Sequence, residues 1–193
     1  MQLSPRPEVL DFLLSRRSRP AKTLTGPGPE RGALEVMLRA AARSPDHGKL
    51  EPWRFVVLRG AALSRLAEAT RARGLALGKD PDKLEKDVTG FERSPVVVAV
   101  VASPKPSEKI PEVEQTLSAG AVCLALLNAA LASGWGANWL SSWMAYDPVF
   151  LTESLGLAQG EFVAGFLHIG TETSVPPDRP RPDLDAVVDW MDI

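Results

Sequence analysis

Three short segments combine residue types that could bind an anionic ligand with a flat ring. Arg16-Arg17-Ser18-Arg19 groups guanidinium donors with a hydroxyl, and such groups bind phosphate through charge-assisted hydrogen bonds. Arg43–Trp53 carries ionisable side chains on a loop that proline and glycine shape. Gly134–Ser142 has glycines that allow close backbone approach and tryptophans that could flank a ring. The alternative for the first segment is a basic helix end that complements the helix dipole.

The distribution of charge favours a small anionic ligand over nucleic acid. Residues 1–59 carry a net charge of +5 and residues 60–193 a net charge of −7, which gives −2 overall. The pI of about 5.8, the scattered arginines and the single Tyr differ from the basic surfaces of nucleic-acid binders. A basic N-terminal third in a mildly acidic protein instead suggests a phosphate-bearing small molecule. The alternative is a solvated surface of uneven charge.

A long stretch without charge, Gln115–Tyr146, spans 32 residues. About 20 apolar residues cross a bilayer, so a membrane span has to be considered. Asparagine, serine and glycine interrupt this stretch, and its upstream flank is acidic where an anchored helix usually carries Lys or Arg. We therefore predict a buried helix followed by a buried loop, and no membrane segment. The N-terminus has no signal-peptide pattern, so a reducing, cytoplasmic setting is expected.

Cysteine and histidine are too few for several kinds of site. The single cysteine, Cys123, excludes a disulfide scaffold, and with only two histidines we predict no metal site. Cys123 falls within an apolar helical stretch and is expected to pack in the core. His168 alternates within an apolar strand and is expected to be a core or edge histidine. The sequence has no P-loop, no nucleophile elbow and no zinc-protease motif.

The elements that must position these segments form one α+β domain over residues 1–193, with a proline-rich tail from about residue 172. Val96–Ala102 is apolar at every position and is expected at the sheet centre, covered on both faces. Periodicity predicts helices over 7–17, 30–43, 61–73, 81–88, 112–133, 148–156 and 183–191, and strands over 54–58, 96–102 and 162–169. The segment 135–142 allows one more short strand.

Five pieces of sequence occur in an order that resembles the nitroreductase family of FMN-dependent oxidoreductases, and in particular its short bacterial NAD(P)H nitroreductases. They are Arg16–Ser18, Ala42–Phe55, Ser94–Val98, Glu114–Gly120 and Gly165–Thr171. Together they extend the resemblance over essentially the whole chain. It implies a nitroreductase-like α+β fold with a central, mostly antiparallel sheet flanked by helices. It also implies a homodimer with the long central helix at the interface and FMN sites between the subunits.

The resemblance further implies which residues contact FMN. The matching positions are Arg16, Arg17, Ser18, Arg43, His47, Trp139, Leu140, Ser141 and Arg181. The first three match the segment that holds the phosphate and ribityl chain, and Arg179 with Arg181 resembles a basic pair that closes on the phosphate in longer members. Arg43 and His47 match a loop that usually comes from the partner subunit in this family. Residues 139–141 match the segment beside the isoalloxazine ring. Asp46, His47 and Lys49 stand where many members have Ser, Ser and Asn, so substrate preference does not carry over.

The activity that the resemblance implies is that of an FMN-dependent NAD(P)H oxidoreductase. NAD(P)H would deliver hydride to flavin N5, and a nitroaromatic, quinone or similar acceptor would then take the same place, giving ping-pong kinetics. A cation near flavin N1–O2 would favour reduction, and Lys22, Arg43 or Lys49 could supply it. No catalytic residue is named, because water or the flavin can supply protons. The alternatives are a flavin-binding protein without turnover, another flavin chemistry on the same fold, and a helical interaction protein.

Overall fold

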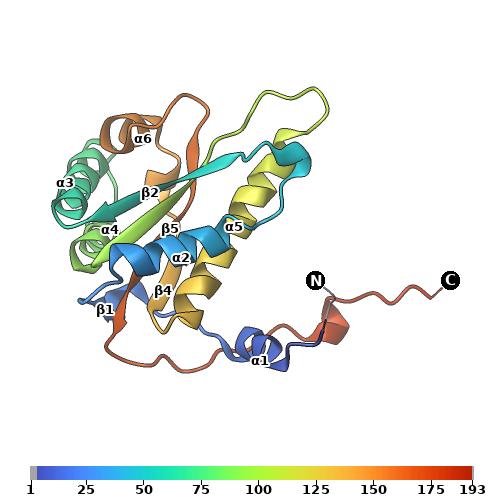
Figure 1. Ribbon diagram of the computed structural model, residues 1–193. Coiled ribbons are helices and arrows are strands. Elements are labelled where there is room, and N and C mark those ends of the chain that lie inside the picture. The colour runs from blue at the N-terminus through green and yellow to red at the C-terminus, as the bar shows by residue number, and fades with distance from the viewer. Residues whose placement is uncertain (1–3, 193) are drawn as a thin grey trace.

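The computed structural model describes residues 4–192 and is built around a five-stranded sheet in which all strand pairs are antiparallel (Figure 1). The strands are β1 (Leu24–Thr25), β2 (Trp53–Arg59), β3 (Val96–Ala102), β4 (Gly136–Leu140) and β5 (Phe162–Glu172). Their order is β1-β5-β3-β2, and β4 also pairs with β5. The 11-residue strand β5 is long enough to pair with three others. The mostly antiparallel α+β arrangement is as expected.

Helices cover both faces of the sheet. They are α1 (Pro7–Ser15), α2 (Arg31–Ala41), α3 (Ala61–Ala76), α4 (Pro81–Arg93), α5 (Glu112–Ala132) and α6 (Pro148–Leu155), with 3-10 turns η1 (Ala21–Thr23), η2 (His47–Lys49), η3 (Trp143–Ala145) and η4 (Leu184–Ala186). The even-numbered valines of β3 pack with α2 and α5, and its odd-numbered residues pack with α3, α4 and α6. Every residue of β3 is buried, which confirms the prediction of a central strand covered on both faces.

Helix α5 and strand β4 contain most of the charge-free stretch. Among residues 4–192, α5 alone has the length and hydropathy of a bilayer span, with a mean hydropathy of 1.5 in its most apolar window. Val122, Cys123 and Leu126 are fully buried against α2 and the sheet, so this helix is part of the core. Leu117 and Leu124, in contrast, are exposed. The predicted long helix is confirmed, with one side against the core and another free.

Helix α1 and the chain after β5 lie outside the layers of helix and sheet (Figure 1). α1 buries none of its residues, and its apolar side chains Val9, Leu10, Leu13 and Leu14 are exposed. In Figure 1 the tail leaves β5, passes the C-terminal end of α5 and reaches α1. The residues after α1 and the C-terminal tail are therefore close in space, although they are far apart in the sequence.

Several predicted boundaries are wrong, each for a physical reason. The helix predicted over 183–191 does not form, and the described tail contains only the turn η4 there. Val187 and Trp190 are exposed, so no packing stabilises a helix too short to persist alone in water. The helix predicted to end at Val88 continues to Arg93, because buried Phe91 anchors its last turn in the core. α3 likewise continues to Ala76.

Candidate functional site

Four consecutive residues after α1 begin the candidate site. The helix predicted over 7–17 ends at Ser15, because Arg16 adopts an extended ψ of 143°. Its last turn contains no basic residue, and Arg16 occupies the C-cap position directly after it. Arg16 Nη2 donates to Ser18 Oγ at 3.2 Å. Arg16 Nε is buried and has no hydrogen-bond partner among the described residues.

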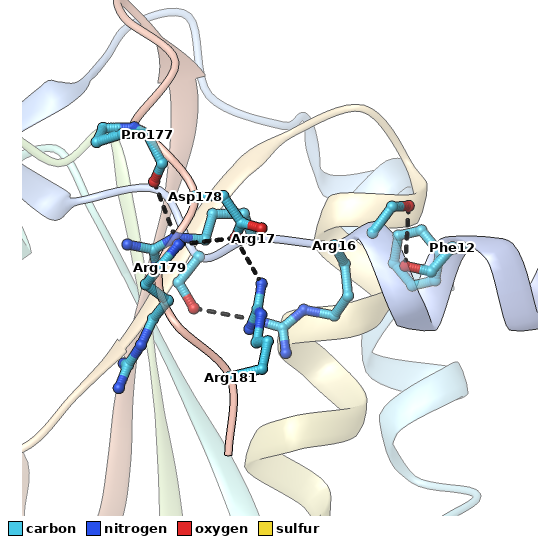
Figure 2. A network of polar contacts seen from close by, with 9 residues as sticks. Phe12, Arg16, Arg17, Pro177, Asp178, Arg179 and Arg181 are labelled. Atoms are coloured by element: carbon cyan, nitrogen blue, oxygen red, sulfur yellow. Dashed lines mark hydrogen bonds and ion pairs between the residues drawn. The ribbon is translucent and has the colours of Figure 1, made fainter. Parts of the chain in front are cut away.

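The C-terminal tail returns to this segment (Figure 2). Arg17 Nε donates to the carbonyl oxygen of Pro177 at 3.4 Å, which ties the tail to the residues after α1. Arg181 lies beside Arg16, and its Nη2 donates to Asp178 Oδ1 at 2.9 Å. The structure thus brings the N-terminal arginines and Arg181 together, as the resemblance implies.

Positive charge is concentrated in this arginine cluster, which we define as Arg16, Arg17 and Arg181. Burial lowers the pKa of Arg16, and the charges of Arg181 and Arg17 lower it further. The neighbouring carboxylate of Glu172 pairs with Arg19, with Nε and Oε2 3.0 Å apart, and not with Arg16. A cavity of about 280 Å³ opens at Arg16, Arg17 and Arg19. A buried donor without an acceptor is unfavourable, so this cavity, which Glu172 also lines, is a candidate anion site.

Strand β4 leads from this cavity to a second one. The backbone N–H of Arg19 donates to the carbonyl oxygen of Ala137 at 2.8 Å, which fixes the arginine segment to β4. Gly136 lines the first cavity, whereas Asn138 and Leu140 line a second cavity of about 600 Å³. The turn η1 and helix α4 supply the cations of its other walls, Lys22, Lys86 and Arg93. Two adjoining cavities along one strand suit a ligand with an anionic end and a larger second part.

Trp139 packs against β5, between the two β4 residues that line the second cavity. Its Nε1 donates to the carbonyl oxygen of Ala164 at 3.2 Å. Gly165 makes room for the indole, because an added Cβ there would overlap Trp139 Nε1 and lie 3.1 Å from Cys123 Sγ. Trp139 remains 36% exposed, so part of its ring reaches the surface. Ser141 is exposed, and its side chain makes no hydrogen bond within residues 4–192.

Arg43 and His47 lie near the other end of α5. His47 Nδ1 is 2.7 Å from Oε2 of Glu114, in the first turn of that helix. Leu131, in its last turn, lines the cavity of the arginine cluster. At 1.5 Å per residue, these two positions of α5 are about 25 Å apart. Within one chain, the predicted contacts therefore fall into two groups that do not meet.

The second cavity contains cations that sequence reasoning missed. Lys22 lines it as one of the three cations suggested for flavin N1–O2, whereas Arg43 and Lys49 belong to the distant group. Lys86 and Arg93 were not predicted. Positions 82, 86, 89 and 93 share one face of a helix, and this spacing could have revealed them. The predicted helix ended at 88, which hid the pattern.

Two residues expected to be structural are confirmed as core residues. Cys123 is fully buried, and burial raises the pKa of its thiol to about 12. His168 is buried, and burial lowers its pKa to about 4. Its Nδ1 lies 2.8 Å from Ser94 Oγ, and its ring stacks on Phe91. Within residues 4–192, no group of three or more His, Cys, Asp or Glu could hold a metal ion.

The fold and the arginine site define a class of protein that sequence comparison identifies. Residues 13–171 match the family described as "Nitroreductase family", and the chain belongs to this family. The Escherichia coli (strain K12) protein "Putative NAD(P)H nitroreductase YdjA" is 33% identical over 180 residues, covering 91% of this chain and 97% of that protein. A Haemophilus influenzae protein, "Putative NAD(P)H nitroreductase", is 36% identical over 166 residues, with 85% and 88% covered.

Solved structures confirm the nitroreductase-like fold. A nitroreductase-like family protein from Bacillus cereus superposes with a TM-score of 0.81 at 22% identity, covering 99% of this chain and 100% of that one. A nitroreductase from Desulfovibrio desulfuricans, solved in complex with FMN, gives 0.74 at 21% identity, with 97% and 99% covered. A mutant of the FMN and NADPH-dependent nitroreductase NfnB from Sphigopyxis sp. strain HMH gives 0.76 at 21% identity, with 99% and 100% covered.

Proposed function

We propose that this protein is an FMN-dependent NAD(P)H oxidoreductase that reduces nitroaromatic, quinone or similar acceptors. The observation that carries the proposal is the buried Nε of Arg16, which lacks a partner among the described residues while Arg17 and Arg181 add like charge. Asp178 pairs with Arg181, whereas Arg16 Nε keeps no acceptor within residues 4–192, and a phosphate would supply that acceptor and further negative charge. The names of the bacterial relatives and the FMN complex of a fold neighbour support FMN as its source.

The residues along β4 fit FMN from end to end. The arginine cluster and Ser18 would hold the phosphate, and the cavity at Leu140 would take the ring. When bound, FMN supplies the redox chemistry, taking hydride at N5 from NAD(P)H and passing it to an acceptor in the same place, by a ping-pong scheme. Lys22, Lys86 and Arg93 line that cavity together with Asp82 and Glu85, so its walls carry three positive and two negative groups, and the excess positive charge would favour an anionic reduced ring.

The proposed functional unit is a homodimer, because each chain holds the predicted contacts in two separate groups. If two α5 helices packed antiparallel, the first turn of one would lie beside the last turn of the other. His47 of the partner subunit would then approach the arginine cluster. Exposed apolar side chains near α5 support such a contact, since large apolar patches usually mark interfaces. They include Leu10 and Leu14 on α1 and Leu117 and Leu124 on α5.

Purified protein tests the cofactor directly. We expect a yellow protein that releases FMN on denaturation, and an apoprotein that regains the flavin absorbance when FMN is added back. A colourless protein that binds no added FMN would contradict the proposal.

Turnover distinguishes an oxidoreductase from a flavin-binding protein. We expect NAD(P)H oxidation that a nitroaromatic or a quinone accelerates, with parallel double-reciprocal plots that indicate a ping-pong scheme. A protein that retains FMN but does not oxidise NADH or NADPH would instead be a flavin-binding or flavin-handling protein.

A further inference from the structure

The first turns of α5 carry the sequence Glu114-Gln115-x-x-Ser118, and each polar side chain in it bonds a different stretch of chain. Gln115 Oε1 accepts from the backbone N–H of Lys105 at 2.7 Å, and its Nε2 donates to the Lys105 carbonyl oxygen at 3.0 Å. Ser118 Oγ donates to the carbonyl oxygen of Pro45 at 2.8 Å. These bonds attach two loops to the start of α5, including the loop that carries His47.

The loop between Pro45 and Trp53 is held at both ends by Ser118. The indole Nε1 of Trp53 donates to Ser118 Oγ at 3.1 Å, so one hydroxyl connects the loop's start and end. Between them, Lys49 and Glu51 have positive φ values of 55° and 46°, which non-glycine residues rarely adopt. Such a conformation persists only when its surroundings fix it, and it is common at functional sites.

Further contacts hold the turn that carries His47. The backbone N–H of Glu51 donates to Asp46 Oδ2 at 2.7 Å. Gly48, with φ of 69°, packs so closely under Ile110 that an added Cβ would overlap it. His47 is thus presented on a loop whose backbone is fixed on both sides.

The remaining polar residue of the motif, Glu114, contacts the His47 ring itself. Its Oε2 lies 2.7 Å from Nδ1, so an ionised Glu114 carboxylate can accept a hydrogen bond from an Nδ1–H group. We propose that Glu114 is a positioning residue that keeps His47 in the Nδ1–H tautomer and turns Nε2 outward for the flavin of the partner subunit. This inference rests on the proposed function. It assigns a role to a motif that the phosphate and ring sites leave unexplained.

The charged groups around the ring are consistent with this role. Asp46 precedes His47, but its Oδ2 is taken by the Glu51 N–H. Lys49 follows on the same turn and cannot accept a proton from the imidazole. Glu114 is therefore the carboxylate that sets which ring nitrogen carries hydrogen. An imidazole oriented in this way offers an acceptor at Nε2 when neutral and a second donor when protonated.

The tautomer can be measured in the apoprotein. The chain has two histidines, so a long-range 1H–15N NMR spectrum at about pH 9 contains two neutral rings, and His47→Gln assigns them. We expect hydrogen on Nδ1 of His47 in the wild type and in Glu114→Gln, whose amide oxygen still accepts. In Glu114→Ala the ring should revert to Nε2–H, the form that an unrestrained imidazole prefers. A wild-type ring with hydrogen on Nε2 would overturn the proposal.

Flavin affinity connects this positioning to the proposed function. We expect Glu114→Ala to raise the Kd for FMN about tenfold, and the double variant with His47→Gln to be no weaker than His47→Gln alone. Glu112→Ala removes the same charge from the same exposed helix turn and should leave the Kd unchanged. Losses that add in the double variant would show that Glu114 does not act through His47. Wild-type protein that binds no FMN would refute the proposed function instead, and the tautomer result would stand separately.

Discussion

The two ends of α5 use polar residues in opposite ways. At the N-terminal end, Glu114, Gln115 and Ser118 all find hydrogen-bond partners on the adjoining loops. At the C-terminal end, Arg16 keeps a buried donor without a partner among the described residues, beside two further arginines. The first end therefore has a satisfied network, whereas the second keeps one buried guanidinium donor unpaired within residues 4–192, with Asp178 paired to Arg181 beside it.

This difference indicates which end is a scaffold and which end binds a ligand. A satisfied network stabilises one arrangement of its loops whether or not a ligand is present. A buried donor without a partner, such as Arg16 Nε, is unfavourable in the free protein, and such groups persist where function requires them. We therefore expect substitutions at the two ends to differ in their effect on the stability of the free protein.

The largest effect is expected from replacing Arg16 and Arg17 together by Ala. Each charge-assisted hydrogen bond contributes roughly 1.5–3 kcal/mol, so the loss of two should raise the Kd for FMN at least about 100-fold. The stability of the apoprotein should change little, because relief of the repulsion between arginines offsets the lost hydrogen bonds to Ser18 and the Pro177 carbonyl. FMN titration and urea unfolding of the apoprotein measure both quantities.

A matched control removes two arginines elsewhere. Arg39 on α2 and Arg65 on α3 are exposed, and their side chains make no hydrogen bond or ion pair within residues 4–192. Replacing both by Ala changes the net charge equally and should leave FMN affinity nearly unchanged. If Arg16→Ala/Arg17→Ala also kept its affinity, the phosphate would have to bind elsewhere.

The sequence predicted those features of the two ends of α5 that depend only on residues close together in the chain. Arg16, Arg17 and Ser18 are consecutive, so their chemistry is visible without knowing the fold. The central strand and the long helix also follow from uninterrupted apolar patterns at Val96–Ala102 and in α5. The prediction that these residues contact FMN, however, came from the family resemblance and not from their spacing alone.

The parts that depend on the path of the chain could not be predicted in the same way. The return of Arg181 to Arg17 spans the length of the protein and follows no periodicity. The helix expected over 183–191 fails because the described residues from 183 onward are exposed and no packing stabilises a helix there. Glu114 and His47 are 67 residues apart, and only the docking of two loops on α5 brings them together.

A smaller effect is expected from Gly165→Ala, beside the middle of α5. The new Cβ would displace Trp139 from the Ala164 carbonyl and press on Cys123 of α5, and overpacking of this kind costs about 2 kcal/mol. FMN affinity should fall as well, because Trp139 belongs to the strand that links the two cavities. Urea unfolding and FMN titration measure these losses.

Gly32→Ala on α2, where nothing lies within 4 Å of the added Cβ, is the control and should not destabilise the protein. Normal stability of Gly165→Ala would mean that the indole position is not fixed by this glycine.

The smallest effect is expected from Ser118→Ala at the N-terminal end of α5. It leaves the Trp53 N–H and the Pro45 carbonyl without their partner, which should lower the free energy of unfolding by about 1 kcal/mol, since water can replace part of these bonds. Ser133→Ala removes only the hydrogen bond from Ser133 to the Ala129 carbonyl at the other end of α5, and it should change stability by less than about 0.5 kcal/mol.

Stabilisation of the apoprotein by inorganic phosphate should persist in Ser118→Ala and vanish in Arg16→Ala/Arg17→Ala, because a ligand stabilises only a protein that still binds it. Loss of the phosphate effect in Ser118→Ala would show that the two ends of α5 are coupled within one chain, and that the division between scaffold and ligand site is wrong.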